Sequence, residues 1–223
     1  MSRRYHRIAV RFGALAGVLM LAFAPGCGSE APPGEAAAPE AFAWPEGGHR
    51  EAVLSLRDGG EIRVALYPEL APASVANFEK LASEGFYDGL TFHRVIPDFM
   101  IQAGDPLTRD DDPRNDGRGG PGYTIPDEFG PAPFTRGAVA MANTGQPDSG
   151  GSQFFIVHRD SPHLAGGYSL FGRVVSGWEA VDAVAAVATD VGGRWGPANR
   201  PIEPVVIERI RIEDGGASGA DAP

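Results

Sequence analysis

The chain has 223 residues, of which 43% are hydrophobic and 22% are charged, and these values are ordinary for a globular protein. This length allows one domain with additional segments at its ends, or two small domains. The net charge of −10 lacks the basic footprint of a nucleic-acid-binding protein, and the single cysteine, Cys27, excludes an internal disulfide. The 31 glycines and 20 prolines favour a loop-rich β fold over a coiled coil or an all-helical protein.

The N-terminal segment has the pattern of a bacterial export signal. Basic residues between Arg3 and Arg11 come before an uninterrupted stretch of apolar residues and glycine, Phe12–Ala24. This stretch is shorter than the ~20 residues that a transmembrane helix needs, and it fits the hydrophobic region of a signal peptide. Residues 1–26 are therefore predicted to form a signal peptide of the lipoprotein type.

Two cleavage patterns overlap at the end of this signal. Ala22-Phe23-Ala24 fits ordinary secretion, whereas Ala24-Pro25-Gly26-Cys27 resembles the lipobox of bacterial lipoproteins, in which the cysteine is lipidated. We expect lipidation of Cys27, because it stands between the apolar stretch and a segment of disorder-prone composition. The expected location is extracytoplasmic in a bacterium, as a membrane-anchored lipoprotein. The alternative is a soluble periplasmic or secreted protein.

Composition divides the rest of the chain into three parts. Residues 27–48 are rich in Ala, Pro, Gly and Glu and are predicted to be a disordered tether, and residues 215–223 a disordered tail. Residues 49–214 are predicted to form one domain. Short β-like runs dominate it, and the strands expected are Glu51–Leu56, Ile62–Leu66, Thr91–Ile96, Phe99–Gln102, Ala138–Met141, Gln153–Val157, Ser169–Val174 and Val205–Ile212.

Two helices are expected between these strands. Pro72–Ser83 has proline in its first turn, an apolar stripe at helical spacing, and Gly85 as a stop signal. Trp178–Val187 carries a second apolar stripe. Many short strands with two helices predict a mainly β protein, a closed barrel or a sandwich with helical lids.

The segment Phe92–Asp105 contains the strongest candidate site. It is predicted to form two strands joined by a turn at Pro97-Asp98, and side chains alternate between the two faces of a strand. The faces expected from this alternation are Phe92, Arg94 and Ile96 on the first strand, and Phe99, Ile101 and Ala103 on the second.

Arg94 is the unusual residue of this segment. An arginine in apolar surroundings is costly unless it is paired or used, and Gln102 is a suitable partner for its guanidinium. From spacing alone, an ordinary arginine on an edge strand is an equally good interpretation.

Two other clusters contain residue types that carry chemistry. His158, Asp160 and His163 match no strong metal-binding spacing, so surface loop residues and no metal site are expected. Asp148-Ser149-Gly150-Gly151 resembles the nucleophile loop of chymotrypsin-like proteases, with His93 and Asp105 as possible partners. The local sequence context does not fit such a protease, and a turn before the next strand is expected instead.

Several motifs in a fixed order resemble the cyclophilins, a family of peptidyl-prolyl cis-trans isomerases, and the match covers most of residues 50–213. The resemblance implies a closed eight-stranded antiparallel β-barrel capped by two α-helices, in agreement with the elements counted above. The motifs are Asn77-Phe78, Gly85-Phe86-Tyr87-Asp88-Gly89, the segment Phe92–Asp105, Gly122-Tyr123-Thr124-Ile125-Pro126-Asp127-Glu128-Phe129, Met141-Ala142-Asn143, Gly151-Ser152-Gln153-Phe154-Phe155-Ile156 and Phe171-Gly172-Arg173-Val174.

The resemblance also implies roles for individual residues. Arg94 matches the catalytic arginine of the family, and Gln102 matches the glutamine that orients it. The substrate-binding residues implied are Phe99, Met100 and Phe155 on the floor of a proline pocket, Ala142, Asn143 and Gln153 along the groove for the substrate backbone, and Leu164 on the pocket rim.

Three departures from the family pattern concern this site. His163 stands where many eukaryotic members have tryptophan, which implies weak inhibition by cyclosporin, and Tyr168 stands where they have histidine. Both are expected to belong to the substrate site, and Tyr168 still supplies an aromatic wall. Asp98 and Ala103 replace common glycines, and a small effect is expected because aspartate tolerates unusual φ angles.

The resemblance thus implies an isomerase that accelerates X–Pro bond rotation in exported proteins and assists their folding. Its expected partners are proline-containing polypeptides and, through the lipid, the membrane; no nucleic acid, metal or other cofactor is expected, and the protein is expected to be a monomer. The alternative is a non-catalytic module that binds proline-containing segments in the same groove. The combination of Arg94, Phe99, Gln102 and Phe155 favours activity.

Overall fold

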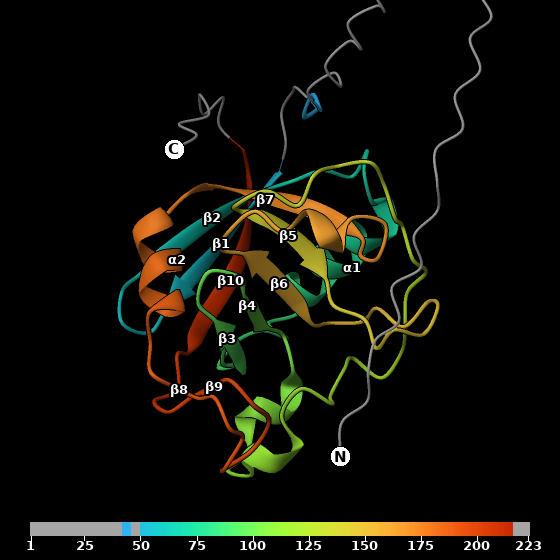
Figure 1. The fold of residues 1–223 in the computed structure, drawn as a ribbon. Helices are drawn as coiled ribbons and strands as arrows, with labels where there is room; N and C mark the ends of the chain where they lie inside the picture. The colour runs from blue at the N-terminus through green and yellow to red at the C-terminus, as the bar shows by residue number, and fades with distance from the viewer. Residues whose placement is uncertain (1–41, 46–49, 216–223) are drawn as a thin grey trace, which may run out of the picture. The chain divides into compact units, whose positions relative to one another are not determined.

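The computed structural model describes residues 42–45 and 50–215 (Figure 1). The predicted signal peptide, the predicted lipidation site at Cys27 and most of the predicted tether lie outside the described residues. None of the helices that the structure describes is long and apolar enough to cross a membrane.

In the described residues, eight strands form one antiparallel sheet with the order β10-β1-β2-β7-β5-β6-β4-β3. A separate two-stranded sheet is formed by β8 (Thr189–Asp190) and β9 (Arg200–Pro201). The strands of the large sheet are β1 (Arg50–Leu56), β2 (Glu61–Leu66), β3 (Arg94–Ile96), β4 (Met100–Ala103), β5 (Ala138–Met141), β6 (Phe154–Val157), β7 (Leu170–Ser176) and β10 (Ile207–Asp214).

The large sheet curls until the segments at its two edges meet. Thr91, just before β3, forms an antiparallel bridge with Val206, just before β10. The Phe92 amide donates to the Val205 carbonyl at 3.0 Å, and the Ile207 amide donates to the Leu90 carbonyl at 2.8 Å. These bonds use edge groups that an open sheet leaves unpaired. The predicted eight-stranded antiparallel fold with two helices is confirmed.

The two helices lie at different places on the sheet (Figure 1). Helix α1 (Pro72–Ser83) has the predicted bounds and packs against β10 and β7, whereas α2 (Trp178–Ala185) packs against β2, β3 and β4. Helix α2 ends two residues before the predicted end, where Ala186 forms the C-cap. Three short 3₁₀ helices were not predicted: η1 (Pro106–Arg109), η2 (Pro113–Asn115) and η3 (Pro162–Leu164).

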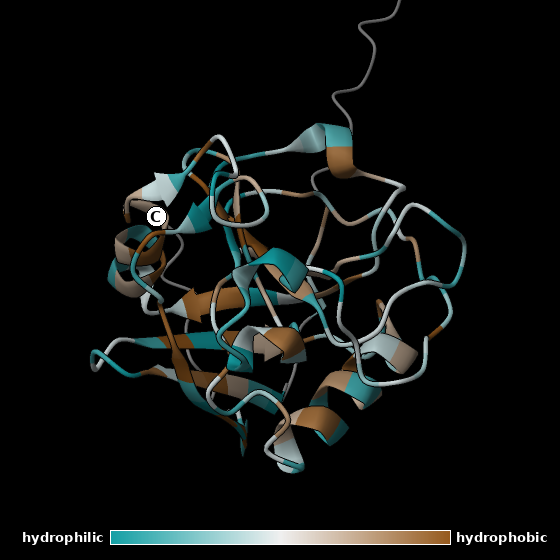
Figure 2. Ribbon diagram, turned by 90° about the horizontal axis from the view of Figure 1, so that it is seen from below, coloured by the Kyte–Doolittle hydropathy of each residue, from teal (hydrophilic) through white to brown (hydrophobic). Residues whose placement is uncertain are grey.

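Alternation along the strands divides the apolar side chains into two clusters, one on each face of the sheet. The inner cluster fills the barrel and includes Ile101 of β4 and Phe154 of β6. The outer cluster includes their neighbours Met100 and Phe155. Figure 2 shows hydrophobic residues concentrated on the strands and helices, with the long loops mainly pale or hydrophilic. Both faces of the sheet therefore carry buried apolar side chains. Only those on the inner face fill the interior of the barrel.

The faces predicted for Phe92–Asp105 are wrong at two positions. Phe92 packs in the inner cluster and not beside Arg94, because the regular strand begins only at Arg94. Phe99 packs in the outer cluster and not with Ile101, because it belongs to the turn before β4. Asp98 in this turn has a φ of 58°, in the left-handed region that favours glycine. This agrees with its position where glycine is common in the family.

Residues 42–45, which the sequence places in the tether, pack against the domain. The ring centroid of Trp44 lies 5.2 Å from that of Tyr67 and 5.4 Å from that of Phe42. The guanidinium of Arg173 lies 5.2 Å from the centre of the Trp44 ring, at cation–π distance. Phe42 and Trp44 thereby extend the outer cluster.

Candidate active site

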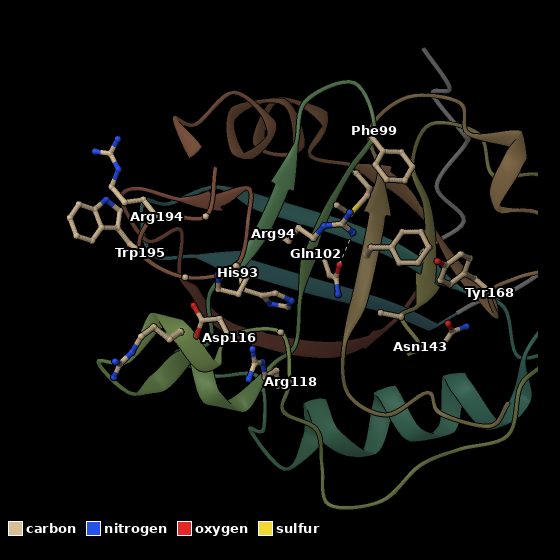
Figure 3. Close-up of a pocket in the computed structure, with 18 of the residues that line it drawn as sticks. His93, Arg94, Phe99, Gln102, Asp116, Arg118, Asn143, Tyr168, Arg194 and Trp195 are labelled. Atoms are coloured by element: carbon tan, nitrogen blue, oxygen red, sulfur yellow. Dashed lines mark hydrogen bonds between the residues drawn. The ribbon is translucent and has the colours of Figure 1, made fainter. Parts of the chain in front are cut away.

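A cavity of about 700 Å³ opens beside the outer cluster, and its walls come from segments far apart in the sequence (Figure 3). We call it the main cavity. It brings together most of the residues that the sequence pointed to, namely Arg94, Phe99, Met100, Gln102, Ala142, Asn143, Phe155, Leu164 and Tyr168.

A chain of side-chain hydrogen bonds fixes Arg94 at this cavity. Arg94 on β3 is directly opposite Gln102 on β4, and its Nη1 donates to Gln102 Oε1 at 3.4 Å. Gln102 Nε2 donates to Gln153 Oε1 at 2.9 Å, and Gln153 Nε2 donates to the Gly119 carbonyl at 2.9 Å. Each amide donates in one direction and accepts from the other, so both amide orientations are set. The predicted pairing of Arg94 with Gln102 is observed, and Arg94 also lines the cavity.

The floor of the main cavity is apolar and rigidly supported. Met100 and Phe155 come from adjacent strands and are almost fully buried. Tyr168 packs edge-on against Phe155, with ring centroids 5.1 Å apart and planes at 85°, a favourable aromatic geometry. Leu164 of η3 closes the same side. This surface suits a small apolar ring and offers it no hydrogen bond.

His163 and Gln153 occupy positions next to the main cavity. The His163 ring stacks on Phe99, with centroids 5.5 Å apart and planes at 27°, so it supports a lining residue and does not itself line the cavity. Gln153 lines an adjoining cavity of about 510 Å³, which shares Gln102 and Asn143 with the main one. The two cavities therefore adjoin at Gln102, the residue that holds Arg94.

The segment after β5 is held in place by local hydrogen bonds. Asn143 Nδ2 donates to the Gly167 carbonyl at 2.9 Å, and Asn143 Oδ1 accepts from the Gly145 amide at 3.1 Å. The Ala142 amide donates to the Gln153 carbonyl at 2.9 Å, which continues the β5–β6 pairing beyond the strands. An extended peptide lying along this segment would meet a preformed surface.

The opposite side of the main cavity was missed by the sequence analysis. It consists of residues 113–118 and 193–197, which we call the loop wall. The Asp116 carboxylate is buried and pairs with Arg200 Nε at 2.6 Å, and burial raises its pKa although Arg200 opposes this. Gly196 lies so close to the Pro113 carbonyl that a side chain would not fit between them. The two loops thus form one surface.

The signals for the loop wall in the sequence were weak. Asp105, buried at its base, accepts hydrogen bonds from the Leu107 and Gly117 amides and so shapes the loop 105–122, whose sequence is acidic and rich in glycine but carries no regular pattern. Trp195 is 66% exposed, so no apolar periodicity marks it. The contacts that build the loop wall join residues that no sequence motif and no regular spacing of apolar residues would relate.

His93 lies beneath the main cavity and was not predicted as part of this site. It is only 2% exposed, and the Gln153 side chain lies next to its ring. Burial lowers its pKa from 6.5 to about 4, and the nearby Asp105 carboxylate opposes this only in part. His93 is therefore neutral at pH 7 and adds no charge to the cavity.

The other candidate clusters are dispersed in the structure. His158 accepts from the Asp98 amide through Nδ1, whereas Asp160 accepts from the Arg136 amide. In residues 42–45 and 50–215, no group of three His, Cys, Asp or Glu side chains is placed to hold a metal ion. Ser149 Oγ donates to the Gln146 carbonyl at 2.7 Å within its own turn, as the turn interpretation predicts.

Known proteins share both the fold and the sequence of this domain. The family model for cyclophilin type peptidyl-prolyl cis-trans isomerases matches residues 53–212. Peptidyl-prolyl cis-trans isomerase B of Bacillus subtilis is 57% identical over 126 residues, which cover 56% of this chain and 82% of that protein. The probable peptidyl-prolyl cis-trans isomerase A of Mycobacterium leprae is 42% identical over 175 residues, covering 69% and 87%.

Solved structures agree with this. A cyclophilin-type isomerase of Cryptosporidium parvum, crystallised in the presence of the dipeptide Ala-Pro, superimposes with a TM-score of 0.65 at 29% identity. The similarity covers 74% of this chain and 99% of that one. The barrel and its cavity thus define a protein of the cyclophilin fold. The chain belongs to the cyclophilin-type peptidyl-prolyl cis-trans isomerases, and the predicted enzyme class is confirmed.

Proposed function

We propose that this enzyme isomerises X–Pro bonds in exported proteins, with Arg94 as its catalytic residue and the main cavity as its proline pocket. The observation that supports this most is the position of the Arg94 guanidinium, held by Gln102 beside a floor of Met100 and Phe155. A cationic donor at the edge of an apolar cavity is the arrangement that this rotation needs.

The chemistry follows from amide resonance. The planar X–Pro bond has a rotation barrier of ~20 kcal/mol and isomerises uncatalysed in ~10–100 s. Twisting the bond breaks the resonance and makes the proline nitrogen more basic, so a donor binds the twisted state more strongly than the planar state. A charged hydrogen bond contributes ~1.5–3 kcal/mol, which corresponds to a rate increase of about ten- to a hundredfold from Arg94.

The remaining acceleration requires that the peptide be held on both sides of the bond. The proline ring would pack on Phe99, Met100 and Phe155, while the segment at Ala142 and Asn143 binds the backbone. Leu164 and Tyr168 limit the pocket, and Gln153 orients Gln102. Catalysis then needs only binding and a fixed donor. The Ala-Pro dipeptide named for the similar Cryptosporidium parvum structure supports such a ligand here. Because one chain supplies the whole pocket, we propose that the protein acts as a monomer.

The proposed role of Arg94 is tested by proline-limited refolding of a model protein, with the wild type beside Arg94→Ala and Arg209→Ala. Arg209 is an exposed arginine on β10 that does not line the cavity, so it controls for loss of charge. We expect a ten- to hundredfold loss of kcat/KM in Arg94→Ala only, as estimated for one charged hydrogen bond. A folded wild type without activity would instead favour a module that only binds proline-containing segments.

The proposed location rests on the sequence of residues 1–27. We propose that Cys27 is lipidated and anchors the enzyme outside the cytoplasm, because a basic segment, an apolar stretch and a cysteine follow one another there. The test is labelling of the full chain with a radioactive fatty acid in a bacterial host, followed by cell fractionation. Labelled wild type in the membrane and unlabelled Cys27→Ser outside it are expected. Equal distribution of the two would contradict the anchor and favour a soluble exported protein.

A further inference from the structure

The ionisable side chains around the proposed proline pocket are mostly arginines. Arg94, Arg114, Arg118 and Arg194 all line it. The acidic residue in the same lining, Asp116, is neutralised by its ion pair with Arg200 at 2.6 Å. The chain as a whole has a net charge of −10, so the pocket is a cationic site on an acidic protein.

Besides Arg94, which is held by Gln102, two of these arginines have no carboxylate partner in the part of the chain that the structure describes. Arg114 pairs with Asp112 at 2.7 Å, whereas Arg118 and Arg194 form no ion pair. Both are exposed on the loop wall, so their guanidinium groups are available to a ligand without breaking an ion pair. Arg194 lies over its neighbour Trp195, with its guanidinium 5.9 Å from the centre of the ring.

The loop wall holds Arg194 and Trp195 at one end of the pocket, whereas Arg118 lies below Arg94 and also lines the adjoining cavity (Figure 3). In Figure 3, Arg194 and Trp195 lie at one end and Asn143 and Tyr168 at the other, with Arg94 between them. The Asp190 carboxylate accepts a hydrogen bond from the Trp195 amide at 2.8 Å, and the Asp116–Arg200 pair joins the two loops. A polypeptide that lies across Arg94 therefore meets the exposed indole and the Arg194 guanidinium at one end of the pocket only, with Arg118 below Arg94 (Figure 3).

We propose that the loop wall selects clients with an acidic residue next to the isomerised proline, through Arg118, Arg194 and Trp195. This inference rests on the proposed function of the pocket. The carboxylate of an aspartate or glutamate pairs with a free guanidinium, and the adjoining part of the peptide packs on the Trp195 ring. An extended peptide advances ~3.3 Å per residue, so acidic residues a few positions on either side of the proline are the ones to test.

The test uses peptides that differ in one residue and contain a single proline. Glutamate, glutamine or lysine is placed two positions before the proline in one set and two positions after it in the other. Exchange NMR at low salt measures kcat/KM for each. We expect glutamate to exceed glutamine about three- to tenfold in one of the two sets, with lysine slowest, because one or two exposed ion pairs contribute. The advantage should shrink in 0.5 M salt, as screening requires.

Variants assign this preference to the loop wall. Arg118→Gln and Arg194→Gln should each lower the ratio of kcat/KM for the glutamate peptide to that for the glutamine peptide about two- to fivefold. Adding Trp195→Ala to either variant should lower this ratio further. Arg209→Gln, which removes the same charge from exposed β10, should leave the ratio unchanged.

The possible failures are distinguishable. Equal kcat/KM for glutamate and glutamine in both sets, with the neutral peptides still accelerated, overturns the inference and leaves the isomerase intact. A preference that survives both arginine variants overturns it as well. No acceleration of any peptide contradicts the proposed function itself.

Discussion

The two sides of the pocket are built by different physical means. The floor follows from strand alternation: Phe154 and Phe155 are neighbours on β6, yet one fills the barrel and the other supports the cavity. Their positions are fixed by the register with β4 and by burial in close-packed clusters. A residue on the floor therefore cannot move without disturbing the barrel.

The loop wall depends on a few polar bonds between distant parts of the chain. The pair of Asp116 and Arg200 joins residues 84 positions apart, and Asp105 holds the turn at Gly117 from below. Because the wall is not part of the large sheet, its exposed side chains can change without altering Arg94. Under the proposed function, the barrel carries the reaction and the loops select the client.

The largest effect on stability is expected from Phe154, on the inner face. Its ring lies 5.3 Å from that of Phe78 and 5.7 Å from that of Tyr87, all in the barrel interior. Phe154→Ala should lower the free energy of unfolding by ~3–5 kcal/mol, because it leaves a buried cavity. Denaturant unfolding measures this. Phe155→Ala, beside the open cavity, should destabilise the protein less than Phe154→Ala but lower kcat/KM more. The opposite result would contradict the assignment of the two side chains to different faces of the sheet.

The second prediction concerns pH and the buried His93. Folding lowers its pKa from 6.5 to about 4, so between these pH values the unfolded chain binds more protons than the folded one. The free energy of unfolding therefore falls as the pH drops from about 7 to 4, by about 3 kcal/mol from this group. The measurement is denaturant unfolding across this range for the wild type and His93→Gln. Parallel profiles would show that His93 contributes no pH dependence.

The third prediction separates the wall from the floor. Arg200→Ala leaves the Asp116 carboxylate buried without its partner, which should cost ~2–3 kcal/mol, since Arg200 itself is partly exposed. Hydrogen exchange should accelerate at Gly193–Pro197 while β4 and β6 remain protected. Adding Asp116→Asn should restore part of the loss. Equal loosening of β6 would mean that wall and barrel unfold as one unit.

The sequence predicted the floor much better than the wall, for a physical reason. Arg94 and Gln102 are eight residues apart in one predicted hairpin, which made Gln102 a suitable partner, whereas Met100 and Phe155 were implied by the family resemblance. Asp116 meets Arg200 only after the whole barrel has formed, and no local pattern indicates that pair. Phe99 was assigned to the wrong face because a turn residue does not follow the alternation of the strand after it.

The smallest effect concerns two tryptophans: Trp44, which the sequence placed in the tether, and Trp195 in a loop of the domain. Trp44 packs on Tyr67 and Arg173 behind the outer cluster, whereas Trp195 projects from the loop wall. Trp44→Ala should lower the free energy of unfolding by ~1–2 kcal/mol, since it removes aromatic and cation–π contacts of a half-buried ring. Trp195→Ala should change it by less than ~0.5 kcal/mol, as for other exposed positions. Thermal unfolding of both variants measures the difference. Equal values would mean that residues 42–45 do not brace the floor, and its rigidity would then come from the sheet alone.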